Sequence, residues 1–146
     1  MLDNFYKKMN ESKKNADNAI LQIIHLMYLI EDLIRGMNMI CYQDLQRYYP
    51  KALKLINDYK EKVMLNYIKG NLIKGIQEGY YREDLDIEIV ARFRMESSLY
   101  TFQNDLFPNH TFNNLNVTYQ LLAIYLYGIA TPKGYNIIKK HLEKNK

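Results

Sequence analysis

Apolar residues recur at intervals of three and four positions along most of the chain, a spacing that predicts amphipathic helices. The clearest run begins after Asp17 and Asn18, either of which can cap a helix, and ends near Gly36 and Asn38. Leucines between its main apolar positions widen the stripe, so we expect much of this helix to be buried. Its main apolar positions are Ile20, Ile23, Ile24, Met27, Ile30, Ile34 and Met37.

A second long helix is predicted from Pro50 to about Glu78. Proline is favoured in the first helical turn, and the residue before a proline is biased away from the helical conformation, so a boundary falls at Pro50. The apolar positions of this helix are Leu53, Ile56, Tyr59, Val63, Tyr67, Ile68, Leu72 and Ile76. Residues 2–15 have a shorter helical pattern and are interpreted as the end of a helix.

The stretch "GYYREDLDIEIVARF" follows the second helix and contains several acids. Gly79 is placed to end that helix in the left-handed conformation, residues 80–85 form a turn, and Asp86 is placed to cap the next helix, predicted over 86–105. Glu88 lies in the first turn, where the helix dipole favours negative charge. The acids therefore have structural roles, which we favour over the alternative of a catalytic acid and base.

A loop around "FPNHT" precedes a further helix over residues 113–130. Thr131 and Pro132 then have the residue types of a helix cap and a first helical position, so a last helix follows them. No run of alternating β-branched residues competes with these helices. The sequence therefore predicts an all-α protein, a multi-helix bundle.

The chain has 146 residues, of which 48% are hydrophobic and 25% charged, as expected for one globular domain. The net charge is +4, but the lysines are scattered and are best interpreted as solvated helix faces. The single cysteine, Cys41, excludes an intramolecular disulfide and suits a reducing, cytoplasmic location. The most apolar run is too short to span a bilayer, so we expect no membrane partner.

Motifs that carry catalysis or cofactor binding are absent from the sequence. The three histidines, His25, His110 and His141, are far apart, and no pattern typical of a zinc or calcium site occurs. The glycines form no phosphate-binding loop, and no serine lies in a nucleophile elbow. We therefore predict no catalytic residue, no metal and no cofactor.

A set of methionines and tyrosines, with one histidine, has two interpretations. Such residues at core positions usually pack against their neighbours, but thioethers and phenols also line small-molecule pockets inside helical bundles. The candidate pocket residues are His25, Met27, Tyr28, Met37, Tyr42, Met95 and Tyr100. Arg92 and Arg94 are expected to pair with Glu88 and Glu96, or to lie across a subunit interface.

Three stretches together resemble the C-terminal regulatory domain of TetR-family transcriptional regulators. They are "DLQRYYPKALKLI", "LIKGIQEGYYREDLDIEIVARF" and "LYGIATPKGYNIIKKHL". The resemblance extends over most of the chain and depends on the order and spacing of the three stretches. The matching positions are Asp44, Tyr49, Pro50, Gly75, Gly79, Arg82, Asp84, Asp86, Ala91, Gly128, Ala130, Thr131, Lys133 and Gly134.

The resemblance implies a cytoplasmic, bacterial regulatory domain that forms a homodimer and binds a small apolar or amphipathic effector. Residues 1–15 would then be the end of a helix from an N-terminal DNA-binding head that this chain lacks, and residues 16–146 the ligand-binding and dimerisation domain. DNA would be bound only through that head. The alternative is a stand-alone helical protein that binds a small molecule without DNA. The helices at 86–105 and 113–130 are the candidates for the dimer interface, through Leu99, Phe102, Leu121, Tyr125, Gly128 and Ile129.

Overall fold

A computed structural model describes residues 2–36, 44, 47–102, 105–108 and 110–143. Asn38 and two of the predicted pocket residues, Met37 and Tyr42, lie outside the described residues, as does the side chain of Phe102.

The described residues fold into helices alone, which confirms the all-α prediction. An isolated bridge between Tyr81 and Ala130 is the one extended pairing among them. The elements are α1 (Leu2–Asn15), α2 (Ala19–Gly36), α4 (Pro50–Tyr59), a π-helical turn (Lys60–Met64), α5 (Leu65–Gln77), α6 (Ile87–Ser98), a 3-10 turn (Tyr100–Phe102), α7 (Asn114–Ile129) and α8 (Pro132–Glu143).

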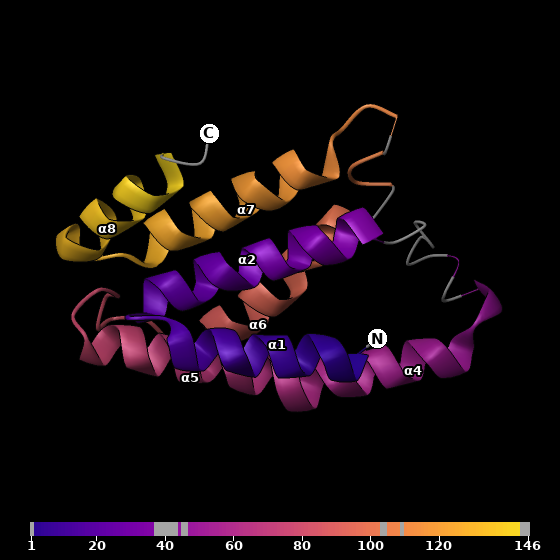
Figure 1. Cartoon of the computed structure of the whole chain (residues 1–146), viewed down its shortest axis with the longest axis horizontal. Helices are drawn as coiled ribbons and strands as arrows, with labels where there is room; N and C mark the ends of the chain where they lie inside the picture. The colour runs from indigo at the N-terminus through magenta and orange to yellow at the C-terminus, as the bar shows by residue number, and fades with distance from the viewer. Residues whose placement is uncertain (1, 37–43, 45–46, 103–104, 109, 144–146) are drawn as a thin grey trace.

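Helix α2 is the centre of the bundle. Figure 1 shows it between α1 and α5 on one side and α7 on the other, and it contacts α8 as well. Its residues Ile20, Ile23, Ile24 and Met27 are buried, as the sequence predicts. A helix with neighbours on several sides needs the wide apolar stripe that this sequence provides.

The start of α2 is fixed by two side chains. The Asn18 side-chain oxygen accepts a hydrogen bond from the Leu21 amide at 2.9 Å, so Asn18 is the cap. The Ala19 amide donates to Oε1 of Glu78 at 2.8 Å, although the two residues are far apart in the sequence. A carboxylate at this position also interacts favourably with the positive end of the α2 dipole.

The second long helix is helical throughout, but the prediction of one uninterrupted α-helix is wrong at Lys60–Met64. Those residues form a π-helical turn between α4 and α5. A π turn places an additional residue in the helix and rotates the face that follows. Beyond it, Leu65, Ile68 and Leu72 are buried against α2 and α6.

The turn after α5 is joined to the α7–α8 junction by backbone contacts, and we call residues 79–82 with 129–134 the clasp. Gly79 has a φ of 78°, the left-handed conformation that its position predicts. The Thr131 hydroxyl donates to the Gly79 carbonyl oxygen at 2.7 Å, and the Thr131 amide donates to that of Tyr80 at 3.0 Å. A side chain at Gly134 would overlap the Tyr80 carbonyl group. Three of the matching positions, Gly79, Thr131 and Gly134, are thus explained by the contacts of the clasp.

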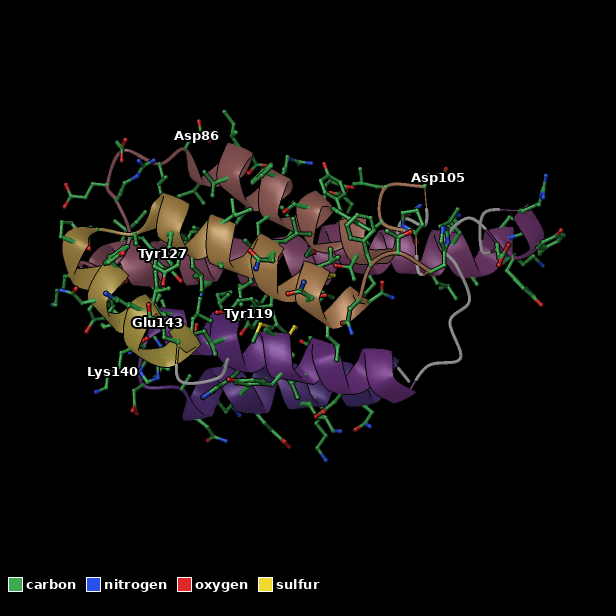
Figure 2. All side chains as sticks on the ribbon, turned by 90° about the horizontal axis from the view of Figure 1, so that it is seen from above. Asp86, Asp105, Tyr119, Tyr127, Lys140 and Glu143 are labelled. Atoms are coloured by element: carbon green, nitrogen blue, oxygen red, sulfur yellow. The ribbon has the colours of Figure 1, made fainter. Side chains whose placement is uncertain are left out.

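Helix α6 begins at its predicted cap but ends earlier than predicted. The Asp86 carboxylate accepts a hydrogen bond from the Ile89 amide at 3.0 Å. The α-helix stops at Ser98 and not at residue 105, and a 3-10 turn follows. The hydroxyls of Ser97 and Ser98 donate to carbonyl oxygens three residues earlier, a bond that competes with the α-helical pattern. Figure 2 shows α6 leading from Asp86 toward the end of the molecule where Asp105 lies.

Helices α7 and α8 pack through tyrosines. The predicted cap of α8 is confirmed, because the Thr131 hydroxyl accepts a hydrogen bond from the Gly134 amide at 3.1 Å. The Tyr119 hydroxyl donates to the Leu142 carbonyl oxygen at 3.3 Å. The rings of Tyr127 and Tyr135 lie 5.1 Å apart, and Figure 2 shows Glu143 of α8 on the side of α7 that carries Tyr119 and Tyr127.

Candidate ligand-binding site

The acidic residues after Gly79 form ion pairs and a helix cap at the surface of the protein. Asp84 pairs with Arg82 at 3.4 Å, and Asp86 caps α6. Glu88 pairs with Lys69 of α5 and with Arg92, whose Nε lies 2.7 Å from Glu88 Oε1. Hydrogen bonds from Lys69 and then Arg92 lower the pKa of the Glu88 carboxyl. The predicted pairing of Arg92 with Glu88 is therefore confirmed, and these acids form no enclosed site.

The predicted pocket residues are only partly brought together. Met27 and Met95 are buried in one core cluster, and Tyr28 packs against it. His25 and Tyr100 are half-buried and are not members of that cluster. The two methionines therefore pack as core residues, which is the first of the two interpretations that the sequence allows.

A chain of buried hydrogen bonds links α1, α2, α5 and the clasp. The Tyr81 hydroxyl donates to the side-chain oxygen of Asn71 at 2.9 Å. The Asn71 amide nitrogen donates to the Ala19 carbonyl oxygen at 2.8 Å and to Gln22 Oε1 at 3.1 Å. Gln22 in turn donates to the Lys13 carbonyl oxygen at 3.1 Å. Since each of these side chains is almost fully buried, the network fixes how the three helices meet.

Tyr81 fits this position because the facing residue of α5 is a glycine. The Tyr81 side chain is fully buried, and a Cβ atom added at Gly75 would overlap its aromatic ring. The clasp therefore places the phenol of Tyr81 in the centre of the bundle. Burial raises the pKa of Tyr81 well above its usual value, and the neighbouring Tyr125, Glu78 and Tyr67 raise it further while Arg94 lowers it.

Arg94 lies inside the bundle and not on its surface. Its side chain extends from α6 with its Cζ atom 4.9 Å from the centre of the Tyr125 ring on α7, and the residue is 8% exposed. Among the described residues, no carboxylate lies within ion-pair distance of it. The predicted pairing of Arg94 with an acid on its own helix is therefore wrong. Burial lowers the pKa of the guanidinium, but arginine stays protonated at neutral pH.

Two buried tyrosine hydroxyls lack a hydrogen-bond partner in the described structure: that of Tyr125, whose ring lies under Arg94, and that of Tyr67, which interacts electrostatically with Tyr81. Burial raises the pKa of Tyr67 to about 12 and that of Tyr125 higher still. Both hydroxyls therefore remain protonated at neutral pH and can donate a hydrogen bond.

Together, Arg94, Tyr125, Tyr67 and Tyr81 form what we call the Arg94 cluster. It joins α5, α6, α7 and the clasp, and its tyrosines belong to a core that is otherwise aliphatic or methionine. A buried cation and two free phenols can accept a polar or charged group from a ligand. The sequence analysis did not find this cluster. The signal was present, because position 94 follows Ala91 by three residues on the apolar stripe of α6.

The predicted interface residues divide into buried and accessible groups. Tyr125 and Ile129 are buried in the core of their own chain. Leu121 and Leu99 are half-buried, and Gly128 is exposed. Ile124, which the sequence analysis did not select, lies beside them on α7 and is 66% exposed. Any contact with a second copy through α7 would therefore use Leu121, Ile124 and Gly128.

Metal binding and membrane spanning find no support in the part of the chain that the structure describes. It contains no group of three or more metal-ligating side chains. None of its helices combines the length and the apolar character that crossing a bilayer requires. Comparison of the chain with protein-family models, with curated proteins and with solved structures gives no match.

Proposed function

We propose that this chain is the effector-binding and dimerisation domain of a transcriptional regulator of the TetR type. The domain would act by binding a small molecule in its interior and not by catalysis. The observation that carries the proposal is the Arg94 cluster, a buried cation with unsatisfied phenols in an all-helical core. A fold that needed no ligand would be more stable with an apolar residue in place of an unpaired buried charge.

The cluster is placed where a ligand could change the arrangement of the helices. Arg94 comes from α6, Tyr125 from α7 and Tyr67 from α5, and Tyr81 connects them to the hydrogen bonds of α1 and α2. A ligand that binds one arrangement of these helices better than another shifts the population between them. Helix α1 would carry that change toward a DNA-binding head.

Homodimer formation is supported by the outer faces of α6 and α7. Ile89 and Phe93 are one helical turn apart on α6, and Phe93 is 57% exposed. On α7, Gly128 has open space beside it, so the fold of the single chain does not require a glycine there. A glycine next to Leu121 and Ile124 would let a second helix approach closely. These faces favour the regulator over the alternative, a stand-alone binding protein.

Sedimentation velocity of three purified proteins tests the dimer. We expect the wild-type chain to be a dimer at micromolar concentration. Ile124→Glu should give a monomer, because it places a charge in the proposed contact. Leu55→Glu is the matched control, since Leu55 is 64% exposed on α4, away from α6 and α7. A wild-type monomer would overturn the regulator proposal in favour of the stand-alone binding protein.

A further inference from the structure

The charge of the Arg94 cluster indicates the chemistry of its ligand. Arg94 is a buried cation without an ion pair among the described residues, and the face of the Tyr125 ring is its recorded contact. A cation–π contact leaves the edges of the guanidinium free to donate hydrogen bonds. Those edges match the two oxygens of a carboxylate. Water could satisfy a phenol, but it would not balance the charge.

Glu78, an acid that acts electrostatically on Tyr81 of this cluster, already has a partner. Glu78 is close enough to raise the pKa of Tyr81, but its carboxylate accepts the Ala19 amide at the start of α2. It forms no ion pair with Arg94. Among the described residues one positive charge therefore remains, and one negative charge on a ligand would balance it. A dianion such as a phosphate monoester would leave a second charge buried without a partner.

The hydrophobic core to which the tyrosines belong supplies apolar contacts. Apart from its tyrosines, the core cluster that contains Tyr67, Tyr81 and Tyr125 consists of aliphatic residues and methionines. Such side chains favour an aliphatic or aromatic body on the ligand. Methionine adapts to ligands of irregular shape, and this core contains Met9, Met27 and Met95.

We propose that the Arg94 cluster binds the carboxylate of a small amphipathic monoanion, with Arg94 as the ion-pair partner and the Tyr125 hydroxyl as a further donor. Tyr67, which is within electrostatic range of Tyr81, supplies the second free hydroxyl. The inference rests on the proposed ligand-binding function and adds the class of the ligand. It separates this site from one that binds neutral or cationic effectors.

Calorimetric titration of the full chain with three probes that share one tail tests the inference. The probes are octanoate and octylammonium, each below its critical micelle concentration, and 1-octanol below its solubility limit. We expect octanoate to bind with a Kd at least about tenfold lower than that of 1-octanol, since a charge-assisted hydrogen-bonded pair contributes that much or more. Octylammonium should bind more weakly than either, because it places a second cation beside Arg94.

Two arginines on α6 provide a matched pair of variants. Arg94→Met removes the buried charge and should bring the Kd of octanoate to that of 1-octanol. Arg92→Met is the control, because Arg92 lies on the exposed side of the same helix and pairs with Glu88. It should leave the preference for octanoate unchanged. Circular dichroism confirms that each variant is folded.

A second pair of variants gives a result even if Arg94→Met alters the fold. Tyr125→Phe keeps the ring under the guanidinium and removes only the free hydroxyl. It should therefore raise the Kd of octanoate several-fold and leave the Kd of 1-octanol unchanged. Tyr119→Phe is the control, because Tyr119 lies on the same helix as Tyr125 but outside the Arg94 cluster, and its hydroxyl already donates to the Leu142 carbonyl oxygen. It should leave the ratio of the two Kd values unchanged.

The possible outcomes separate the two proposals. Equal affinity of the wild-type chain for octanoate and 1-octanol would overturn the anion assignment and leave small-molecule binding standing. A preference for octanoate that survives in Arg94→Met would also overturn the assignment, because the charge would then be recognised elsewhere. No binding of any probe would overturn this inference and the proposed function together.

Discussion

At the scale of single residues, the centre of the molecule depends on a glycine facing a tyrosine. The Tyr81 ring occupies the space that a side chain at Gly75 would need, and its hydroxyl is the first member of the buried hydrogen-bond chain. Gly75 is therefore required by packing and not by its backbone conformation. The neighbouring Gly70 lies on the same helix but has only the end of the Lys13 side chain within 4.0 Å.

The two glycines give the first prediction. Gly75→Ala should lower the free energy of unfolding by about 1–3 kcal/mol, because the methyl group forces the Tyr81 ring to move in a packed core. Gly70→Ala should be neutral or stabilising by up to about 1 kcal/mol, because alanine favours the helix and the site has room. Urea unfolding monitored by circular dichroism measures both. Equal effects of the two substitutions would show that the Tyr81 ring does not occupy this space.

The difference between Arg92 and Arg94 shows which residues could be predicted from the sequence. Arg92 pairs with Glu88 four positions earlier, and a spacing along one helix is visible in the sequence. The position of Arg94 depends on Tyr125, a residue on another helix. The apolar stripe of α6 indicates that position 94 faces inward, but an arginine there suggests a surface residue unless the partner is known.

At the scale of elements, the starts of the helices were predicted well, but the interior of the long helix and the end of α6 were not. Asp86 and Thr131 cap as predicted, and Asn18 is the cap among the two residues that the sequence offered for α2, because each bond closes within three residues of the cap. The π turn at Lys60–Met64 could not be seen, since the residues around it keep a helical spacing. The early end of α6 involves two serine hydroxyls, whose choice of partner depends on the packing around them.

The cap of α6 gives the second prediction. Asp86→Ala should lower the free energy of unfolding by about 0.5–2 kcal/mol, because the Ile89 amide loses its partner and the positive end of the helix loses a negative charge. Asp84→Ala is the control, since Asp84 pairs only with the exposed Arg82, and should cost less than about 1 kcal/mol. Chemical unfolding compares the two. A larger loss for Asp84→Ala would contradict the assigned roles.

At the scale of the whole molecule, buried tyrosines make the core sensitive to alkali. Burial raises the pKa of Tyr67 from the usual 10.0 to about 12 and raises that of Tyr81 well above 10.0. An unfolded chain ionises these phenols near pH 10, while the folded core holds them neutral. The stability they contribute is therefore fully present below pH 10 and is lost as the pH rises toward about 12.

The third prediction follows from this difference. Between pH 10 and about 12, the midpoint of urea unfolding should fall, and the tyrosinate absorbance of the buried phenols should appear together with loss of helix. Tyr67→Phe should reduce the pH dependence in this window. Ionisation of all tyrosines near pH 10 with the helices intact would show that the phenols are open to solvent.

The arrangement of the whole chain could be predicted in outline from its sequence. The order of helices follows from local patterns, but the clasp joins segments about 50 residues apart, and only the structure shows why their motifs occur together. The site could be predicted less well. The predicted pocket residues Met27 and Met95 pack in the core. The ligand site that we propose is instead a polar cluster, whose residues were not among the predicted pocket residues.

The central claim is that a dimeric helical body holds a small anionic ligand at Arg94, and native mass spectrometry of the purified chain tests it most directly. We predict a dimer that carries an additional small mass, lost on denaturation, and an Arg94→Met protein that is a dimer without that mass. A wild-type monomer without bound mass across micromolar concentrations would contradict the account, in its interface and its ligand alike.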